Sequence, residues 1–175
     1  AEAGNVLILT KDRLTESASE YAQGGIAVAL SDDDRVSLHE QDTLQAGAGL
    51  CDTQAVRTLV EEGPRRIQRL IDWGVEFDTD GGKLSFTRKG AHSVNRVLHA
   101  HGDSTGREIA RTLISKVRSI NRITAQSFSA VVDLLVEDGE VCGAIAWREE
   151  TRELIPVYAR TVLLATGGLG RVYRE

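Results

Sequence analysis

The sequence has little cysteine, no long apolar run and no excess of basic residues, and each of these absences excludes a class of protein. Its two cysteines, Cys51 and Cys142, are far apart and fit no metal-binding spacing, which predicts buried thiols in a reducing cytoplasm. No apolar run approaches the roughly 20 residues that span a bilayer, and no signal peptide is recognisable. The net charge of −5 argues against broad nucleic-acid binding, which depends on basic surface. We therefore expect neither a membrane span nor a nucleic-acid partner.

What is present is the composition of a soluble globular domain. Hydrophobic residues make up 41% and charged residues 27% of the 175 positions, which is enough chain for one domain. The chain begins almost directly on an apolar run, without an initiator Met, and stops soon after a glycine cluster. We therefore expect a segment of a longer protein.

Two continuous apolar runs, residues 5–10 (NVLILT) and 161–165 (TVLLA), predict strands buried on both faces of a parallel sheet. Apolar residues at helical spacing predict helices within 35–49, 52–74 and 104–119. Residues 31–34 (SDDD) offer a cap for the first of these helices, and Asp52 or Thr53 a cap for the second. Gly63 followed by Pro64 predicts that 52–74 forms two helices, with Pro64 in the first turn of the second.

Elsewhere the apolar residues alternate with a period of two, which predicts antiparallel strands. Residues 75–87 form one predicted hairpin that turns at 80–82 (DGG), and 137–140 (EDGE) mark the turn of another. Further short strands are expected within 122–127 and 153–159. The order of elements predicts an α/β fold: a parallel sheet with a helical insert and an antiparallel β-meander.

Four stretches carry a resemblance to a known family. They are residues 161–168 (TVLLATGG), 21–30 (YAQGGIAVAL), 40–78 (EQDTLQAGAGLCDTQAVRTLVEEGPRRIQRLIDWGVEFD) and 87–109 (TRKGAHSVNRVLHAHGDSTGREI). They resemble the flavoprotein family that contains succinate dehydrogenase and fumarate reductase, and the two long stretches narrow the resemblance to its branch that oxidises L-aspartate. The resemblance covers essentially the whole chain and implies a partial FAD-binding Rossmann-like sheet.

The resemblance implies that residues 18–25 contact FAD. Gly24 and Gly25 lack Cβ atoms, so their main chain can lie against the isoalloxazine ring. The alternative, which we call the structural reading, is that the two glycines serve only a tight turn. The family members that attach FAD covalently have a histidine at position 18, where this chain has Ala18, so we expect non-covalent FAD. The other candidate residues of the segment, whose backbone N–H groups can bond the cofactor, are Ser19, Glu20, Tyr21, Ala22 and Gln23.

Further FAD contacts are implied at three other places. Lys11 follows the first predicted strand and would meet the adenosine side of FAD, although a lysine at a strand end is also compatible with simple solvation. The backbone of Ala130 would meet the adenine. Close main-chain approach to the cofactor is expected at Thr166, Gly167 and Gly168.

Lys89 and His92 are the candidate substrate residues. In the aspartate-oxidising branch a glutamate stands where this chain has Lys89, and its carboxylate orients the substrate ammonium. A lysine about 4 Å from that ammonium would repel it by roughly 1–4 kcal/mol. Either Lys89 turns outward, or Glu76 or Asp103 replaces the missing acid, or the substrate is a dicarboxylate without an amine, such as succinate or fumarate.

The resemblance implies oxidation of a small dicarboxylate, L-aspartate, with oxygen or fumarate as electron acceptor and quinolinate synthase as a candidate partner in NAD biosynthesis. We expect residues 1–175 to be a fragment of one FAD-binding domain. The glycine-rich phosphate turn would precede Ala1 and the catalytic residues would follow Glu175, so no catalytic residue is assigned here. A non-catalytic module remains the alternative from another class. His99 and His101 lack a third ligand nearby, and no metal site is expected.

Overall fold

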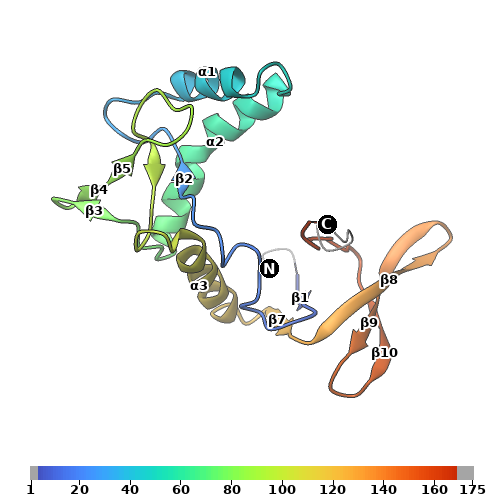
Figure 1. Cartoon of the computed structure of the whole chain (residues 1–175). Helices are drawn as coiled ribbons and strands as arrows, with labels where there is room; N and C mark the ends of the chain where they lie inside the picture. The colour runs from blue at the N-terminus through green and yellow to red at the C-terminus, as the bar shows by residue number, and fades with distance from the viewer. Residues whose placement is uncertain (1–3, 169–175) are drawn as a thin grey trace, which may run out of the picture. The chain divides into compact units, whose positions relative to one another are not determined.

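The computed structural model describes residues 4–168, and its contacts divide the chain into two compact units. The sheet unit consists of the residues up to Ala18 and those from Val117 onward, and the helical unit of Ser19–Lys116. Figure 1 shows the elements of both units, and each unit is described by itself.

Two sheets make up the sheet unit (Figure 1). Strands β1 (Val6–Leu9) and β7 (Ile123–Gln126) pair in parallel. Strands β8 (Ser129–Glu137), β9 (Glu140–Arg148) and β10 (Glu153–Tyr158) form an antiparallel sheet in the order β10-β9-β8. The antiparallel meander and the turn at 137–140 are confirmed. A parallel pair is present, but β1 pairs with the strand within 122–127, where an antiparallel strand was expected, and not with residues 161–165.

Two further predictions for this unit were wrong. Residues 161–165 form no strand in the described part of the chain, where Leu163 is 88% exposed, because a strand needs a hydrogen-bonded neighbour and none is placed beside this run. Strand β1 is not buried on both faces, since Val6 and Leu7 are exposed.

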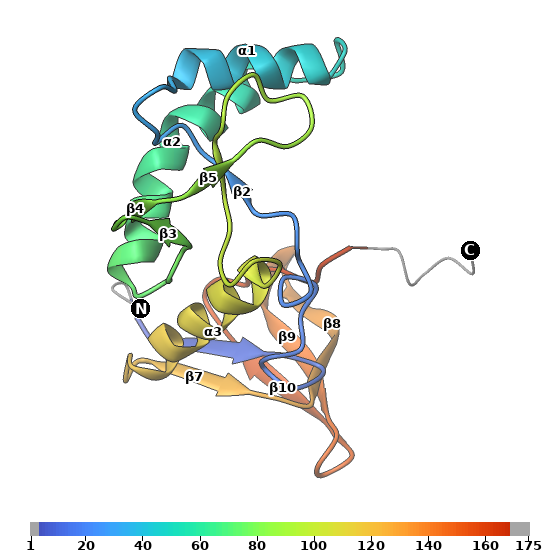
Figure 2. The same cartoon turned by 60° about the vertical axis from the view of Figure 1, so that its left-hand side comes forward.

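The helical unit holds three helices and two small sheets, seen from a second side in Figure 2. The helices are α1 (Val36–Ala46), α2 (Thr53–Asp72) and α3 (Thr105–Arg118), whose last two residues pass into the sheet unit. Strands β2 (Ile26–Ala27), β6 (Val97–Leu98) and β5 (Phe86–Thr87) are antiparallel in the order β2-β6-β5. Strands β3 (Thr79–Asp80) and β4 (Lys83–Leu84) form the predicted hairpin.

A hydrophobic core lies between the helices and these strands. Apolar side chains from α2, from the chain after it and from β6 are buried together, and more apolar groups pack on them. The buried members are Val28, Ile67, Val75, Phe77, Leu98 and Ala100. This core fixes β6, and with it the chain on either side that carries the candidate site.

Helix α2 is one continuous helix, so the predicted break at Pro64 was wrong. Proline removes one backbone hydrogen bond, but Val56, Val60 and Ile67 are buried on both sides of it, and their shared burial keeps the helix whole. The cap prediction is resolved in favour of Asp52, whose Oδ1 accepts a 2.8 Å bond from the Ala55 N–H.

The predicted cap for α1 was also wrong. Arg35 occupies the N-cap position without a side-chain hydrogen bond. Asp34, the last acid of the predicted capping stretch, instead bonds the guanidinium of Arg96. The carboxylate of Asp34 therefore pairs with the buried guanidinium of Arg96 and does not cap α1.

Candidate functional site

The predicted flavin segment, residues 18–25, crosses from one unit to the other after Ala18. Its helical-unit part begins with a turn in which the Ala22 N–H donates to the Ser19 carbonyl (3.2 Å). The N–H of Gly106, in the first turn of α3, donates to the Ala22 carbonyl (3.0 Å). A Cβ on Gly106 would lie 2.8 Å from that oxygen, so only glycine lets α3 approach this turn. Gly106 was not predicted from the sequence, although a glycine just inside a predicted helix is the signal of such an approach.

Gly24 and Gly25 have different reasons to be glycine. Gly25 has a φ of +79°, and a Cβ there would lie 2.6 Å from the Leu98 carbonyl, so the pairing of β2 with β6 requires it. A Cβ on Gly24 would meet nothing within 4 Å. The structural reading therefore accounts for Gly25, while Gly24 offers an open face of bare main chain.

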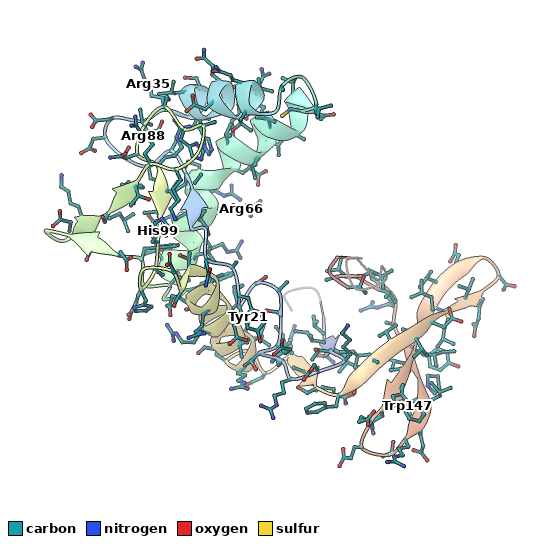
Figure 3. All side chains as sticks on the ribbon, in the orientation of Figure 1. Tyr21, Arg35, Arg66, Arg88, His99 and Trp147 are labelled. Atoms are coloured by element: carbon teal, nitrogen blue, oxygen red, sulfur yellow. The ribbon has the colours of Figure 1, made fainter. Side chains whose placement is uncertain are left out.

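The open face at Gly24 also presents hydrogen-bond donors. Gln23 and Gly24 are exposed, and within residues 4–168 their N–H groups donate to no protein acceptor. Tyr21, labelled in Figure 3, is 62% exposed on the same segment. Ser19 is exposed and Glu20 is half-buried. Exposed main-chain donors beside empty space suit the polar edge of a flat ligand.

Lys89 and His92 lie on one loop, residues 88–95, which leads into β6. The His92 N–H donates to the Lys89 carbonyl at 3.4 Å, so a single turn joins the backbones of the two predicted substrate residues. Lys89 is exposed and makes no salt bridge to any described residue, whereas His92 is half-buried. The His92 ring lies 5.6 Å from the His39 ring, edge to face.

Arg96 ends this loop, with no exposed surface, between two carboxylates. Its Nε and Nη2 donate to Asp34 at 2.9 Å each, and its Nη1 donates to Asp42 Oδ2 at 2.8 Å. Such a bidentate pair is strong and directional, and removing Arg96 would leave two carboxylates without a cation. This cluster could not be predicted, because no regular sequence spacing relates residues 34, 42 and 96.

The electrostatics of the cluster follow from its packing. Burial raises the pKa of Asp42, but hydrogen bonds from Ser93 and the charge of Arg96 outweigh it, so the pKa lies below its ordinary value. Burial and the nearby Arg96 charge lower the pKa of His39. The Nδ1 of His39 is buried without a hydrogen-bond partner among the described residues. The cluster thus favours charged Asp42 and neutral His39.

A cavity of about 290 Å³ lies beside Lys89. Asp103 shares it with Lys89, and Glu76 does not, so Asp103 is the better placed of the two acids considered as replacements for the missing glutamate. Its walls carry hydroxyls, carboxylates and one imidazole, His99, whose Nε2 lies 3.0 Å from Thr87 Oγ1. The lining residues are Asp78, Ser85, Thr87, Lys89, His99, Gly102 and Asp103.

In the sheet unit, the structure brings Lys11 and Ala130 to one edge. Lys11 is exposed two residues after β1, next to Thr10, whose carbonyl accepts a 2.9 Å bond from the Ser129 N–H. Ala130 follows in β8, half-buried and opposite Trp147. This edge holds the carboxyl ends of the parallel strands β1 and β7, where open α/β sheets bind their ligands.

The other predicted cofactor residues of the sheet unit are not gathered at that edge by any described contact. Ala18 is exposed in a turn. Thr166, Gly167 and Gly168 are exposed and belong to no helix or strand. Their proximity to FAD stays a prediction.

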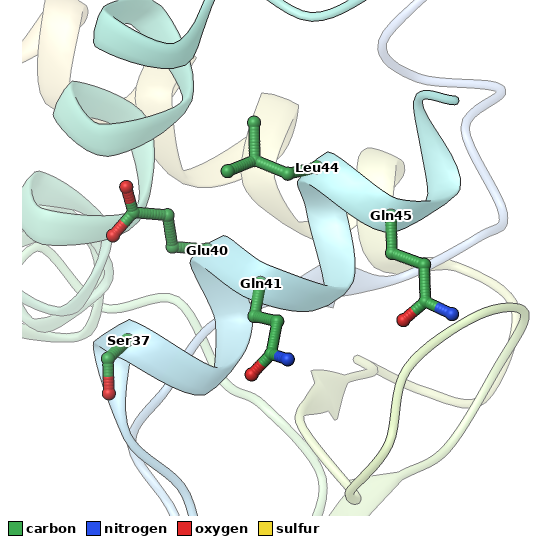
Figure 4. Close-up of a pocket in the computed structure, with 5 residues that line it drawn as sticks. All are labelled: Ser37, Glu40, Gln41, Leu44 and Gln45. Atoms are coloured by element: carbon green, nitrogen blue, oxygen red, sulfur yellow. The ribbon is translucent and has the colours of Figure 1, made fainter. Parts of the chain in front are cut away.

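A second hollow on the surface is lined by a single helix. A hollow of about 530 Å³ beside α1 is lined by Ser37, Glu40, Gln41, Leu44 and Gln45 (Figure 4). All five belong to α1, so one helix supplies the whole lining.

Among residues 4–168, no three His, Cys, Asp or Glu side chains are grouped to hold a metal ion. His101 lies beyond the end of β6 with a φ of 48°, so it does not share a strand face with His99. No helix in the described part is long and apolar enough to cross a membrane.

Comparison with known proteins identifies the family. The family model described as FAD binding domain matches residues 1–175. The chain belongs to this FAD-binding family. Its cofactor is accordingly FAD, and the α/β prediction is confirmed.

Named relatives and solved structures agree with this assignment. The chain is 40% identical over 172 residues to L-aspartate oxidase of Neisseria meningitidis serogroup B, covering 98% of this chain and 34% of that protein. It is 43% identical to L-aspartate oxidase of Streptomyces coelicolor, covering 95% and 30%. Mycobacterium smegmatis Sdh1 in complex with UQ1 has a TM-score of 0.90 at 31% identity, covering 97% and 31%. The chain thus spans about a third of the length of the relatives it matches.

The residues present fit FAD on structural grounds. A Cβ on Gly24 would meet no described atom within 4 Å, so the main chain there is open to a flat ligand, and the adjacent N–H groups are available to acceptors. The sheet unit offers exposed Lys11 and the nearby backbone of Ala130 at the carboxyl edge of its parallel strands. Each unit, taken by itself, therefore offers groups of the kind that a dinucleotide cofactor binds.

Proposed function

We propose that the chain is part of an FAD-dependent L-aspartate oxidase, which converts L-aspartate to iminoaspartate in NAD biosynthesis. The observation that carries this proposal is the 40% identity to a named L-aspartate oxidase over 98% of the chain. Because the chain covers 34% of that relative, the activity belongs to a longer protein, and we expect residues 1–175 alone to be inactive.

In this proposal residues 18–25 hold the flavin, with Gly24 against the ring and nearby N–H groups on its polar edge. Lys11, Ala130 and residues 166–168 contact the rest of the cofactor. Ala18 has no nucleophilic side chain, so the cofactor is held non-covalently. Bound FAD supplies the acceptor for two electrons from the substrate.

The substrate is a small dicarboxylate held by Lys89 and His92. Lys89 suits a carboxylate, because it is exposed, lines a cavity and has no salt bridge in the described part of the chain. Asp103, in the same cavity, is the group that suits the ammonium of aspartate. Oxygen or fumarate is the electron acceptor, quinolinate synthase is the candidate partner, and the setting is the cytoplasm.

The second candidate is a succinate dehydrogenase or fumarate reductase type of activity. The observation that favours it is Lys89 itself, whose positive charge opposes an ammonium and tolerates a dicarboxylate without one. A TM-score of 0.90 to a quinol-fumarate reductase, at 30% identity, is consistent with it.

The deciding experiment uses the purified full-length protein and compares L-aspartate with succinate. The flavin absorbance is followed without oxygen, and peroxide formation with oxygen. Bleaching and peroxide with aspartate alone support the oxidase, whereas bleaching with succinate alone selects the second candidate. After acid precipitation the flavin should remain in solution, and a yellow pellet would contradict non-covalent binding.

A further inference from the structure

Asp42 and Asp34 both neutralise the buried guanidinium of Arg96, but they differ in what else they hold. Asp34 Oδ1 additionally accepts from the N–H of its neighbour Arg35 (2.8 Å), which is a local bond. Asp42 Oδ2 accepts two bonds from Ser93, one from its N–H and one from its Oγ, both at 2.8 Å. Of these two carboxylates, only Asp42 bonds the interior of the loop 88–95, and it does so from α1.

Ser93 is adjacent to His92, so this junction restrains the predicted substrate residues. The Nδ1 of His92 lies 3.5 Å from Arg96 Nη1, the same nitrogen that bonds Asp42. The His92 ring also packs edge to face against the ring of His39, which belongs to α1. The turn from Lys89 to His92 is closed by their backbone bond. The carboxylate of Asp42 in α1 thus bonds both Ser93, which follows His92 in the sequence, and Arg96, which lies beside the His92 ring.

We propose that Asp42 is a positioning residue of the substrate site, which holds the loop 88–95 through Ser93 and so sets where Lys89 and His92 meet the dicarboxylate. Asp42 is buried and acts through the loop, not on the substrate itself. This inference rests on the proposed function, because it assigns the loop to substrate binding. It predicts that Asp42 and Asp34 have separable effects although both bond Arg96.

The test compares Asp42→Asn with Asp34→Asn in the full-length protein with FAD bound, using L-aspartate. Both variants weaken a buried ion pair and should lower the midpoint of thermal unfolding. Only Asp42→Asn should raise KM, by about tenfold, the size expected from weakened hydrogen bonds to a charged group, with kcat changed less than about threefold. Asp34→Asn should leave KM within about twofold.

A milder variant and a second measurement keep the test decisive. Ser93→Ala removes only the hydroxyl bond and should raise KM by about threefold, even if Asp42→Asn fails to fold. Amide hydrogen exchange in residues 88–95 should accelerate in Asp42→Asn and not in Asp34→Asn.

The possible failures are distinguishable. Equal KM values in the two aspartate variants, or a normal KM in Ser93→Ala, would overturn the positioning role while the oxidase activity stands. A wild-type protein that turns over neither aspartate nor succinate would overturn the proposed function, and the positioning role with it.

Discussion

The two units of the chain differ in what they bury. The helical unit encloses a core that includes Leu98 and Ala100, each with no exposed surface, and an ion cluster around the buried Arg96. In the sheet unit the buried apolar residues are Ala144 and Ala146 among those described, while Leu163 and Tyr158 are largely exposed. The helical unit closes its own interior, whereas the sheet unit presents apolar surface. The candidate substrate residues Lys89 and His92 accordingly lie in the helical unit, whose buried core supports their loop.

A pair of leucines tests this comparison most strongly. Leu98→Ala should destabilise the 175-residue chain by about 2–5 kcal/mol, because it removes a fully buried side chain and leaves a cavity. Leu163→Ala should change stability by less than about 0.5 kcal/mol, since that side chain is exposed. Urea unfolding measures both. Equal costs would show that residues 161–165 are covered and that the contrast between the units is wrong.

Acid should weaken the helical unit through Glu108. Hydrogen bonds from Arg111 lower the pKa of this buried carboxyl to about 2. Burial raises the same pKa, but its effect is smaller. The folded-state pKa lies below the ordinary 4.5, so the contribution is fully present above pH 4.5 and is lost as the pH falls toward 2. We expect a loss of about 1–3 kcal/mol, reduced by the exposure of Arg111.

Hydrogen exchange between pH 5 and 3 locates that loss. Protection should fall first in residues 19–116, and Glu108→Gln should remove most of the pH dependence. A loss confined to the sheet unit, or an unchanged pH dependence in the variant, would contradict the assignment.

Local patterns predicted much of the fold because each rests on neighbouring residues. The turn at 80–82 follows from its Asp-Gly-Gly sequence, and the cap at Asp52 from a carboxylate placed three residues before an N–H it can reach. Pro64 misled because its local cost is smaller than the burial of Val60 and Ile67 in one helix, which only the tertiary structure shows.

The candidate site was predictable only where residue chemistry or resemblance marked it. Lys89 and His92 stand three residues apart in one loop, so their proximity could be anticipated. The meeting of Asp34, Asp42 and Arg96 could not, because it depends on how α1 packs on a loop more than 50 residues later. The different roles of Gly24 and Gly25 likewise need the position of β6.

The central claim is that the bare main chain at Gly24 lies against a non-covalently held flavin, and one substitution tests it directly. Gly24→Val in the full-length protein places a side chain into space that no described protein atom occupies, so the unfolding midpoint of the FAD-free protein should not change. The measurement is the ratio of FAD to protein after purification, from the flavin absorbance. The account predicts that the variant loses most of its FAD, and a variant that retains one FAD per chain with normal turnover would contradict it.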